Sequence, residues 1–350
     1  MELEEFCRKL PKVELHAHLN GSLSHSTMLQ LKRYHADSGL TDNTDAFFDE
    51  FQIAAGDTRN LKQCFQVFRI AHSLTTTPKA LTLATHLTLQ EFQDDGCCYI
   101  ELRSTPRDTP HMTKKQYIEA IILAMLHTPA NMTIISRLIV SIDRRFNFAE
   151  AQEITDLVIE FHKLYSSVVV GIEISGDPSV GKFQTFVPLL ENAKNAGLKV
   201  TLHCGEVCNP DEVQEMLDFN PNRIGHGTCI LPRLGGNDST WNTLCIKKTP
   251  VEVCLTSNVN TKSIANYESH HFKELFDAGI PIIICTDDKG VFATSLSQEY
   301  RLCAETFKLD NSQLAQLSHR ACLYIFDETS RKTVLDKLEH FITHNDLHLQ

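Results

Sequence analysis

The sequence predicts an α/β protein of the (β/α)8 class, a TIM barrel. Three observations support this prediction: eight short runs of β-branched and apolar residues recur along the 350-residue chain, helical patterns separate most of them, and no G-x-G-x-x-G motif follows the first run. Eight parallel strands close a barrel, and the missing motif removes the usual nucleotide signal of the competing open sheet. The expected strands cover residues 12–18, 98–103, 134–143, 168–175, 199–204, 223–226, 251–256 and 281–287.

Apolar residues at helical spacing predict the elements that connect these strands, over residues 113–126, 149–164, 187–196 and 210–219. About eighty residues separate the first two strands, where a simple unit needs roughly thirty. This stretch predicts a helical insertion over about 22–95, with helices near 26–35, 45–53, 60–73 and 79–94. Loops at this end of a barrel carry active sites, so the insertion is expected to act as a lid or a substrate wall.

The rest of the chain completes one expected domain, residues 1–350. From residue 295 onward three further helices are expected, the eighth helix of the barrel and a C-terminal cover. Residues 231–241 are rich in glycine and asparagine and are expected to form a variable loop.

Composition narrows the class of function. The net charge of −11 opposes binding to a nucleic-acid polymer but leaves room for a small anionic substrate. No apolar run approaches the ~18 residues of a membrane helix, and the charged N-terminus lacks the apolar core of a signal peptide. Twelve scattered cysteines without a C-x-x-C pair predict reduced thiols. We therefore expect a cytosolic monomer with no membrane partner.

A pair of histidines, His16 and His18, opens the search for a site. Side chains two apart on a strand share a face, so both imidazoles reach one ion. With 17 histidines in the chain such a pair is weak by itself, but His203 and Asp287 follow at the ends of later strands. Three imidazoles and one carboxylate around an open position are typical of a catalytic zinc site.

Polar side chains close most of the other expected strands as well. In a barrel all eight strand ends face one mouth, and charge is held there only when it is paired or metal-bound. A functional site is therefore expected at this mouth, lined by residues that include Arg103, Asp143, Ser175, Glu206, His226, Ser257 and Asp288.

Four motifs carry a resemblance to a known family: Val-Glu-Leu-His-Ala-His-Leu-Asn-Gly-Ser, His-Cys-Gly-Glu, Arg-Ile-Gly-His-Gly and Cys-Thr-Asp-Asp. From about residue 10 to about residue 330 the chain resembles the adenosine and AMP deaminase family of the amidohydrolase superfamily. It is most similar to the adenosine-deaminase-like branch, the N6-methyl-AMP deaminases, in the stretches 99–107, 141–145 and 287–294.

The resemblance implies a hydrolytic deaminase with one zinc per subunit, bound by His16, His18, His203 and Asp287. Zinc makes hydroxide available near neutral pH. Glu206 would protonate ring N1 as hydroxide adds to C6 of the purine. His226 would hold or deprotonate the water, and Asp288 would accept a hydrogen bond from the purine and help proton transfer to the leaving amine. Two-metal relatives place a modified lysine where this chain has Glu173-Ile174-Ser175-Gly176, so a single ion is expected.

The resemblance also implies a site for a 5′-monophosphate. Adenosine deaminases proper carry Asp at the position of Asn20, and the neutral amide does not repel a phosphate. Ser104, Thr105 and Arg107 add hydroxyls and a guanidinium at the second strand end. The implied reaction converts N6-methyl-AMP and water to IMP and methylamine. The expected substrate-binding residues are His18, Asn20, His72, Ser104, Thr105, Pro106, Arg107, Asp143, Gly176 and Asp288.

Two alternatives remain open. The first is an adenosine deaminase that acts on the free nucleoside, with Asn20 as a neutral change. The second is a non-catalytic binding relative, which should lack a metal ligand or the acid, and both are present in this sequence. A comparison of substrates separates these hypotheses.

Overall fold

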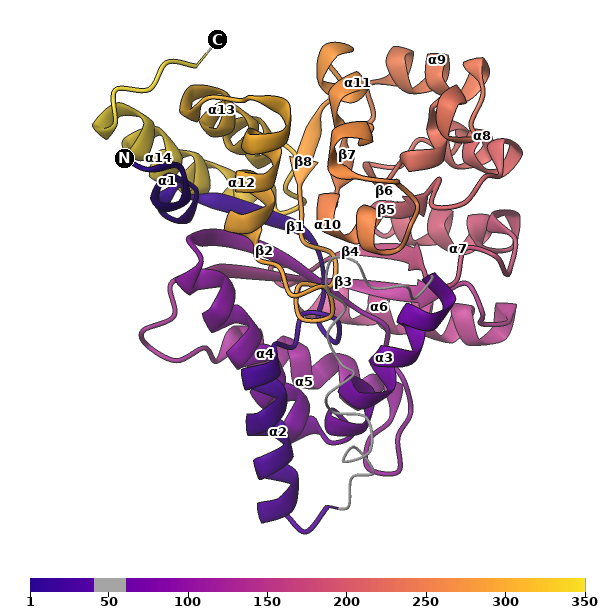
Figure 1. Cartoon of the computed structure of the whole chain (residues 1–350). Helices are drawn as coiled ribbons and strands as arrows, with labels where there is room; N and C mark the ends of the chain where they lie inside the picture. Colours follow the sequence, from indigo (N-terminus) through magenta and orange to yellow (C-terminus); the bar gives the residue numbers. More distant parts are fainter. Residues whose placement is uncertain (41–60, 350) are drawn as a thin grey trace.

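Eight parallel strands form one sheet in chain order, and helices pack around it (Figure 1). The computed structural model describes residues 1–40 and 61–349. The strands are β1 (Lys12–His18), β2 (Cys97–Ser104), β3 (Ile135–Asp143), β4 (Val169–Ser175), β5 (Lys199–Cys204), β6 (Arg223–His226), β7 (Val251–Val253) and β8 (Ile282–Ile284).

The segment after β8 closes the sheet into a barrel. The backbone N–H of Asp287 donates to the carbonyl of His16 at 2.8 Å, and the N–H of His18 donates to the carbonyl of Asp287 at 3.0 Å. Ala17 pairs with Asp287 as a parallel bridge. The predicted (β/α)8 barrel is confirmed, and its closure places two expected metal-binding segments side by side.

The outer helices begin where the sequence offers caps. Thr113 and Asn147 each accept the third backbone N–H of the helix that follows, and each forms a capping box. The predicted helices between β2 and β6 are confirmed to within a few residues. The outer layer comprises α4 (Pro78–Asp94), α5 (Lys114–Leu126), α6 (Phe148–Leu164), α7 (Phe183–Asn195), α8 (Pro210–Asp218), α9 (Asp238–Lys247), α11 (Phe272–Asp277) and α13 (Asn311–Cys322).

Part of the expected insertion belongs to the barrel itself. The described helices α2 (His25–Asp37) and α3 (Leu61–Leu74) lie outside the barrel, as predicted. Helix α4, also assigned to the insertion, packs against β2 and α5 and so belongs to the outer ring. The predicted helix at 45–53 lies outside the described residues.

Three helices follow residue 295, as predicted: α12 (Leu296–Phe307), α13 and α14 (Glu328–His344). Helix α13 packs on β8 and β1 as the eighth barrel helix, and α14 packs on α13. The short α1 (Leu3–Lys9) was not expected; it lies against α12 and near α14 (Figure 1).

Two regions differ from the prediction. Strands β7 and β8 have three residues each, because the chain after β7 winds into α10 (Leu255–Asn260) and the chain after β8 turns toward β1. The expected loop at 231–241 contains the start of α9, where the side chain of Asn237 accepts the N–H of Thr240 at 2.9 Å. Asn237 contributes to the loop-like composition of this stretch and is the N-cap residue of α9.

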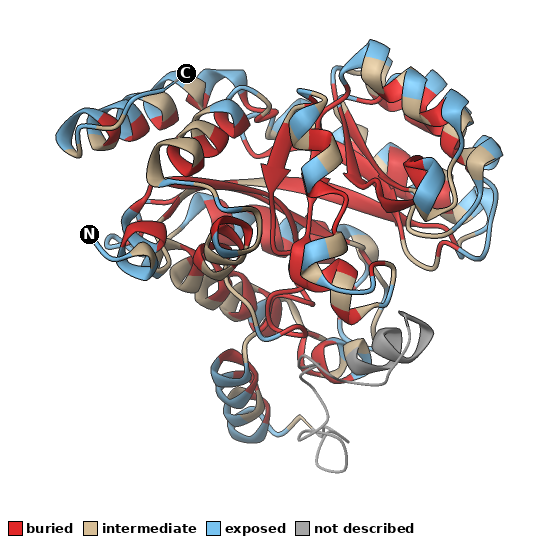
Figure 2. Cartoon of the chain, turned by 45° about the horizontal axis from the view of Figure 1, so that its top comes forward, coloured by how far each residue is buried: buried red, intermediate tan, exposed pale blue. Residues whose placement is uncertain are grey.

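The barrel interior is both buried and charged. The strands are buried along their length, while the outer faces of the helices are exposed (Figure 2). Arg223 binds Glu101 and Glu252 at 2.6 Å each, and Arg103 binds Glu252 at 2.9 Å, with all four side chains fully buried. Such charges remain inside only when paired, and this network forms the floor below the strand ends.

Helices in the described parts of the chain, 1–40 and 61–349, are too short or too polar to cross a lipid bilayer.

Candidate active site

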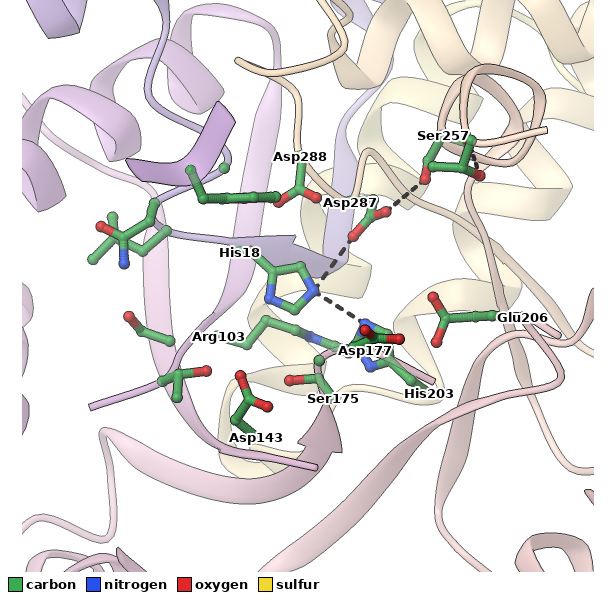
Figure 3. A pocket seen from close by; sticks show the side chains of 18 of the residues that line it. His18, Arg103, Asp143, Ser175, Asp177, His203, Glu206, Ser257, Asp287 and Asp288 are labelled. Carbon is green, nitrogen blue, oxygen red and sulfur yellow. Dashed lines mark hydrogen bonds and ion pairs between the residues drawn. The ribbon is translucent and has the colours of Figure 1, made fainter. Parts of the chain in front are cut away.

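One cavity of about 590 Å³ lies at the carboxyl ends of the strands (Figure 3). Of the expected residues, His16 is fully buried beneath the cavity, and Pro106 is buried away from its lining. The other expected residues line the cavity: His18, Asn20, His72, Ser104, Thr105, Arg107, Asp143, Gly176, His203, Glu206, His226, Asp287 and Asp288.

Three imidazoles and one carboxylate meet at the base of this cavity. Nε2 of His18 lies 3.1 Å from Nε2 of His203 and 3.3 Å from Oδ1 of Asp287. Nε2 of His16 is also 3.3 Å from Oδ1 of Asp287, and the four ligand atoms lie within 4.8 Å of one another. Ligands about 2.0–2.1 Å from a tetrahedral zinc are roughly 3.4 Å apart, so the spacing fits one metal ion.

The ring of His16 is oriented for a metal. Although burial raises the pKa of Glu252, the charges of Arg103 and Arg223 hold it well below its ordinary value. The ionised Oε2 of Glu252 lies 2.7 Å from Nδ1 of His16, so Nδ1 carries the proton. In the neutral ring Nε2 then offers a buried lone pair, and it has no hydrogen-bond partner among the described residues. A carboxylate that orients a ligating histidine is typical of metal sites.

The charges around His16 favour a cation. Burial and the charge of Arg103 lower the pKa of His16, but the adjacent carboxylates of Asp287 and Glu252 outweigh them and raise it to about 9. Ser257 donates a hydrogen bond of 2.6 Å to Oδ2 of Asp287 and leaves Oδ1 toward the imidazoles. The negative charges that favour a proton on His16 would also favour a divalent metal ion at this position.

The backbone is specialised where these groups converge. His226 and Asp287 both have φ of 62°, a left-handed conformation that is uncommon outside glycine and is found at functional sites. A Cβ on Gly225 would lie 2.6 Å from Cε1 of His16, and one on Gly21 would lie 1.6 Å from Oδ1 of Asp288. Only glycine leaves room for the His16 ring and the Asp288 carboxyl.

Two protonatable carboxyl groups face the cluster. Burial raises the pKa of Glu206 above its ordinary value, and burial together with the charge of Asp287 raises that of Asp288 well above it. Oε1 of Glu206 lies 3.7 Å from Nε2 of His226. Oδ1 of Asp288 is buried without a hydrogen-bond partner among the described residues. Carboxyls that keep a proton closer to neutral pH are suited to proton transfer.

A separate polar patch gathers around the hydroxyl of Tyr117. This oxygen lies 2.9 Å from Nδ2 of Asn20, 2.8 Å from Oγ of Ser104 and 3.2 Å from Nη1 of Arg107. The Arg107 guanidinium also lies over the Tyr117 ring, 5.1 Å from its centroid. Tyr117 therefore joins three residues expected at the monophosphate site.

The guanidinium of Arg107 keeps its positive charge uncompensated among the described residues. Its Nη2 donates to the carbonyl of His72 at 3.0 Å and to the carbonyl and hydroxyl of Thr75 at 3.1 and 2.6 Å. These partners are neutral oxygens. Arg145, also in the cavity lining, is instead paired with Asp143 at 2.5 Å. An anion in the cavity would meet Arg107 as a free cation.

Sequence reasoning missed several residues that support the site. Tyr117 lies in the helix predicted over 113–126, and periodicity does not distinguish a buried tyrosine from its apolar neighbours. Glu252 and Glu173, which face His16 and the rings of His18 and His203, were not assigned a role. Their signal was present: each is an acid inside an apolar strand, in Val-Glu-Val and Ile-Glu-Ile.

An eight-stranded barrel with three imidazoles and a carboxylate at its strand ends defines a (β/α)8 protein with a cluster that could hold a metal ion. Comparison with known proteins narrows the class. The chain belongs to the adenosine deaminase family, whose model matches residues 11–341, and this family is metal-dependent.

Its relatives match over nearly the whole chain. It is 43% identical to the N6-methyl-AMP deaminase of Bos taurus, over 96% of this chain and 97% of that protein. It is 40% identical to the N6-mAMP deaminase of Arabidopsis thaliana, over 95% and 96%. The crystal structure of Arabidopsis ADAL complexed with IMP superimposes with a TM-score of 0.86, at 38% identity and over 97% and 99% of the two chains.

Proposed function

We propose that this chain is a zinc-dependent hydrolytic deaminase that converts N6-methyl-AMP and water to IMP and methylamine. The observation that carries the proposal is that one cavity holds both the imidazole–carboxylate cluster and the uncompensated guanidinium of Arg107. The relatives named N6-methyl-AMP deaminases, and a solved relative that binds IMP, support the same substrate class.

The ligand atoms of the cluster are of the types that zinc prefers, and their spacing fits a single ion. His16, His18, His203 and Asp287 would bind it, and nitrogen with carboxylate oxygen is a ligand set typical of zinc. When bound, zinc makes hydroxide available near neutral pH. Glu173, at the end of β4, is held by Arg103 at 2.6 Å. That carboxylate is therefore engaged and not available to a second ion.

Proton movements fall to three residues in the cavity. Glu206, whose pKa is raised, gives its proton to purine N1 as C6 becomes tetrahedral and negative charge develops on the ring. His226 faces the oxygen that adds to C6. Asp288, whose carboxyl is unpartnered among the described residues, accepts a hydrogen bond from the purine and passes a proton to the leaving amine.

The 5′-phosphate binds at the patch around Tyr117. Asn20, Ser104 and Arg107 supply neutral and cationic donors there, and Thr105 and His72 line the same wall. A carboxylate at the position of Asn20 would repel the dianion, whereas an amide does not.

The other end of the cavity holds the purine and the sugar. Asp143 lies beside Gly176, where φ is 96° and a Cβ would come within 2.6 Å of the Asp143 carboxylate. The absence of that Cβ lets the backbone approach the purine edge. Pro106 does not line the cavity, and its expected part in substrate binding stays a prediction.

A substrate comparison tests this proposal. The purified zinc protein is assayed with N6-methyl-AMP, AMP, N6-methyladenosine and adenosine, and its metal content is measured on the same sample. We expect the highest kcat/KM for N6-methyl-AMP. Faster turnover of adenosine would favour the free-nucleoside deaminase, and zinc binding without turnover of any of the four would favour a binding relative.

We propose the cytosol as the compartment and the monomer as the active species. Eleven described cysteines are free thiols, as expected in a reducing compartment. Light scattering of the active preparation tests the monomer, and fractionation of cells that express the chain tests the compartment.

A further inference from the structure

A chain of hydrogen bonds connects a backbone amide to the ring of His226. The N–H of Phe272 lies 3.1 Å from Nδ1 of His270, and Nε2 of His270 lies 3.1 Å from Oδ1 of Asn258. Nδ2 of Asn258 lies 3.0 Å from Nδ1 of His226. His270, Asn258 and His226 are at most 3% exposed. Water therefore does not compete for these contacts.

The donors and acceptors in this series of hydrogen bonds follow from its first bond. A backbone N–H can only donate, so Nδ1 of His270 accepts. Burial holds the pKa of His270 well below its ordinary value, so the neutral ring carries its one proton on Nε2 and donates it to Asn258. The carbonyl of Asn258 is thereby engaged, and its amide nitrogen must donate to Nδ1 of His226. The proton of His226 then lies on Nε2.

We propose that His270 and Asn258 are positioning residues that hold His226 in the Nε2–H tautomer. The ring then acts as a hydrogen-bond donor to the oxygen that adds at purine C6, and not as the base that deprotonates it. This catalytic consequence rests on the proposed function; the tautomer itself does not.

The position of the ring agrees with a donor role. Nε2 of His226 lies on the cavity side, 3.7 Å from Oε1 of Glu206. The ring centroids of His16 and His203 are 4.9 and 5.2 Å away, so the ring lies beside the expected metal ligands. His271 fixes the same residue from its backbone, since its Nε2 donates to the carbonyl of His226 at 2.7 Å. The backbone of His226 is thus held by His271, and its ring is held by His270 through Asn258.

The first test needs no substrate. In the zinc-loaded wild-type protein, ¹⁵N NMR of the histidine side chains, with His226 assigned by its loss in a His226→Gln variant, reports which ring nitrogen carries the proton. We expect the proton on Nε2. A proton on Nδ1 would overturn the proposal whether or not the protein is a deaminase.

The second test reverses the tautomer. In Asn258→Asp the carboxylate has no N–H, so it accepts from both His270 and His226 and moves the proton of His226 to Nδ1. We expect kcat for N6-methyl-AMP to fall by about 10²- to 10⁴-fold, as a wrong histidine tautomer does elsewhere. KM should stay within about twofold and zinc content should be unchanged, because uniform binding is not removed. Retained or increased kcat is the result expected of a base, and it would refute the donor role.

A third comparison guards against a variant that fails to fold. His270→Gln keeps one acceptor and one donor, whereas His270→Phe keeps neither. We expect kcat to be largely rescued in the glutamine variant and to fall about tenfold or more in the phenylalanine variant. The matched control is His162→Phe on α6, which removes a 2.7 Å hydrogen bond between a histidine ring and the backbone carbonyl of Val169, outside the cavity lining. Equal kcat in the two His270 variants would contradict the proposal.

Discussion

The pKa values of three neighbouring carboxyl groups of the cavity are shifted in opposite directions by their surroundings. Burial opposes ionisation of Asp287, but its contact with His16 and the other nearby imidazoles hold its pKa well below the ordinary value. Burial raises the pKa of Glu206 and of Asp288. Residue type alone does not separate a ligand from an acid; position relative to the imidazoles does. This separation is what a site that combines a metal with acid–base chemistry requires.

Glu206→Gln tests the acid directly. The amide keeps the size of the side chain but has no proton to give to N1, so kcat for N6-methyl-AMP should fall by about 10²- to 10⁴-fold. Zinc content should be unchanged, because Glu206 is not among the four clustered ligands. Steady-state kinetics and elemental analysis measure both quantities. Glu215→Gln, on the exposed face of α8, is the matched control. A glutamine variant with wild-type kcat would remove Glu206 from the mechanism.

At the scale of elements, α12 is tied to α10 by one buried carboxylate. Oε2 of Glu299 accepts the N–H of Thr256 at 3.1 Å, and Oε1 accepts the hydroxyl of Thr294 at 2.6 Å. A carboxylate at the N-terminus of α10 meets its free N–H groups and its dipole. Helix α10 carries Ser257, which donates to Asp287, so this contact helps to position an expected metal ligand.

Glu299 should make stability depend on pH. Burial raises its pKa to about 7, above the ordinary value that it regains on unfolding. The folded protein thus holds this proton more tightly, and the stability that it contributes at acid pH is lost as the pH rises toward about 7. We expect Tm to fall less between about pH 5 and pH 8 in Glu299→Gln than in the wild type.

Tm should still fall somewhat with rising pH in Glu299→Gln, because burial also raises the pKa of Glu14 to about 7. Glu305→Gln, on the exposed side of the same helix, is the control and should follow the wild type. Melting curves across the pH range measure all three proteins. Parallel curves for wild type and Glu299→Gln would show that Glu299 does not titrate in this range.

The sequence predicts helices and strands well where a local pattern of apolar and polar residues sets their bounds. It predicts them poorly where contacts between distant parts of the chain, or a single cap residue, set those bounds. Strands β1, β5 and β6 match their predicted bounds because apolar runs end in polar groups. Helix α9 was missed because its cap lies in a stretch with loop composition, and β8 was predicted too long because residues that extend toward β1 resemble a strand. The local residue pattern therefore does not reveal a helix cap, or the contact between β1 and the segment after β8 that closes the barrel.

At the scale of the whole molecule, four expected ligands converge from parts of the chain far apart in sequence. His16 and His18 lie on β1, His203 lies on β5, and Asp287 lies in the segment that closes the barrel. The topology of a closed barrel made their convergence predictable. The network of buried ion pairs below them was not predictable, because the sequence around an acidic residue in an apolar strand does not show which basic residue it pairs with across the barrel. Glu252, for example, binds arginines from β2 and β6 and also orients His16.

Metal removal should therefore affect both activity and stability. A metal bound across β1, β5 and the closing segment joins strands on opposite sides of the barrel, and it binds the folded chain more tightly than the unfolded one. A ligand present at a thousandfold over its Kd adds about 4 kcal/mol of stability, so chelation should lower Tm by several degrees as well as abolish turnover of N6-methyl-AMP.

Zinc added back after removal of the chelator should restore both quantities together. The same chelator presaturated with zinc controls for direct effects on the protein. Activity, Tm and metal content are measured on one sample, so that the loss of ions can be matched to the loss of function. A preparation that holds less than about a tenth of an ion per chain and keeps full activity would contradict the assignment of the four ligands, because no other described cluster of histidine, cysteine and carboxylate side chains has a comparable geometry.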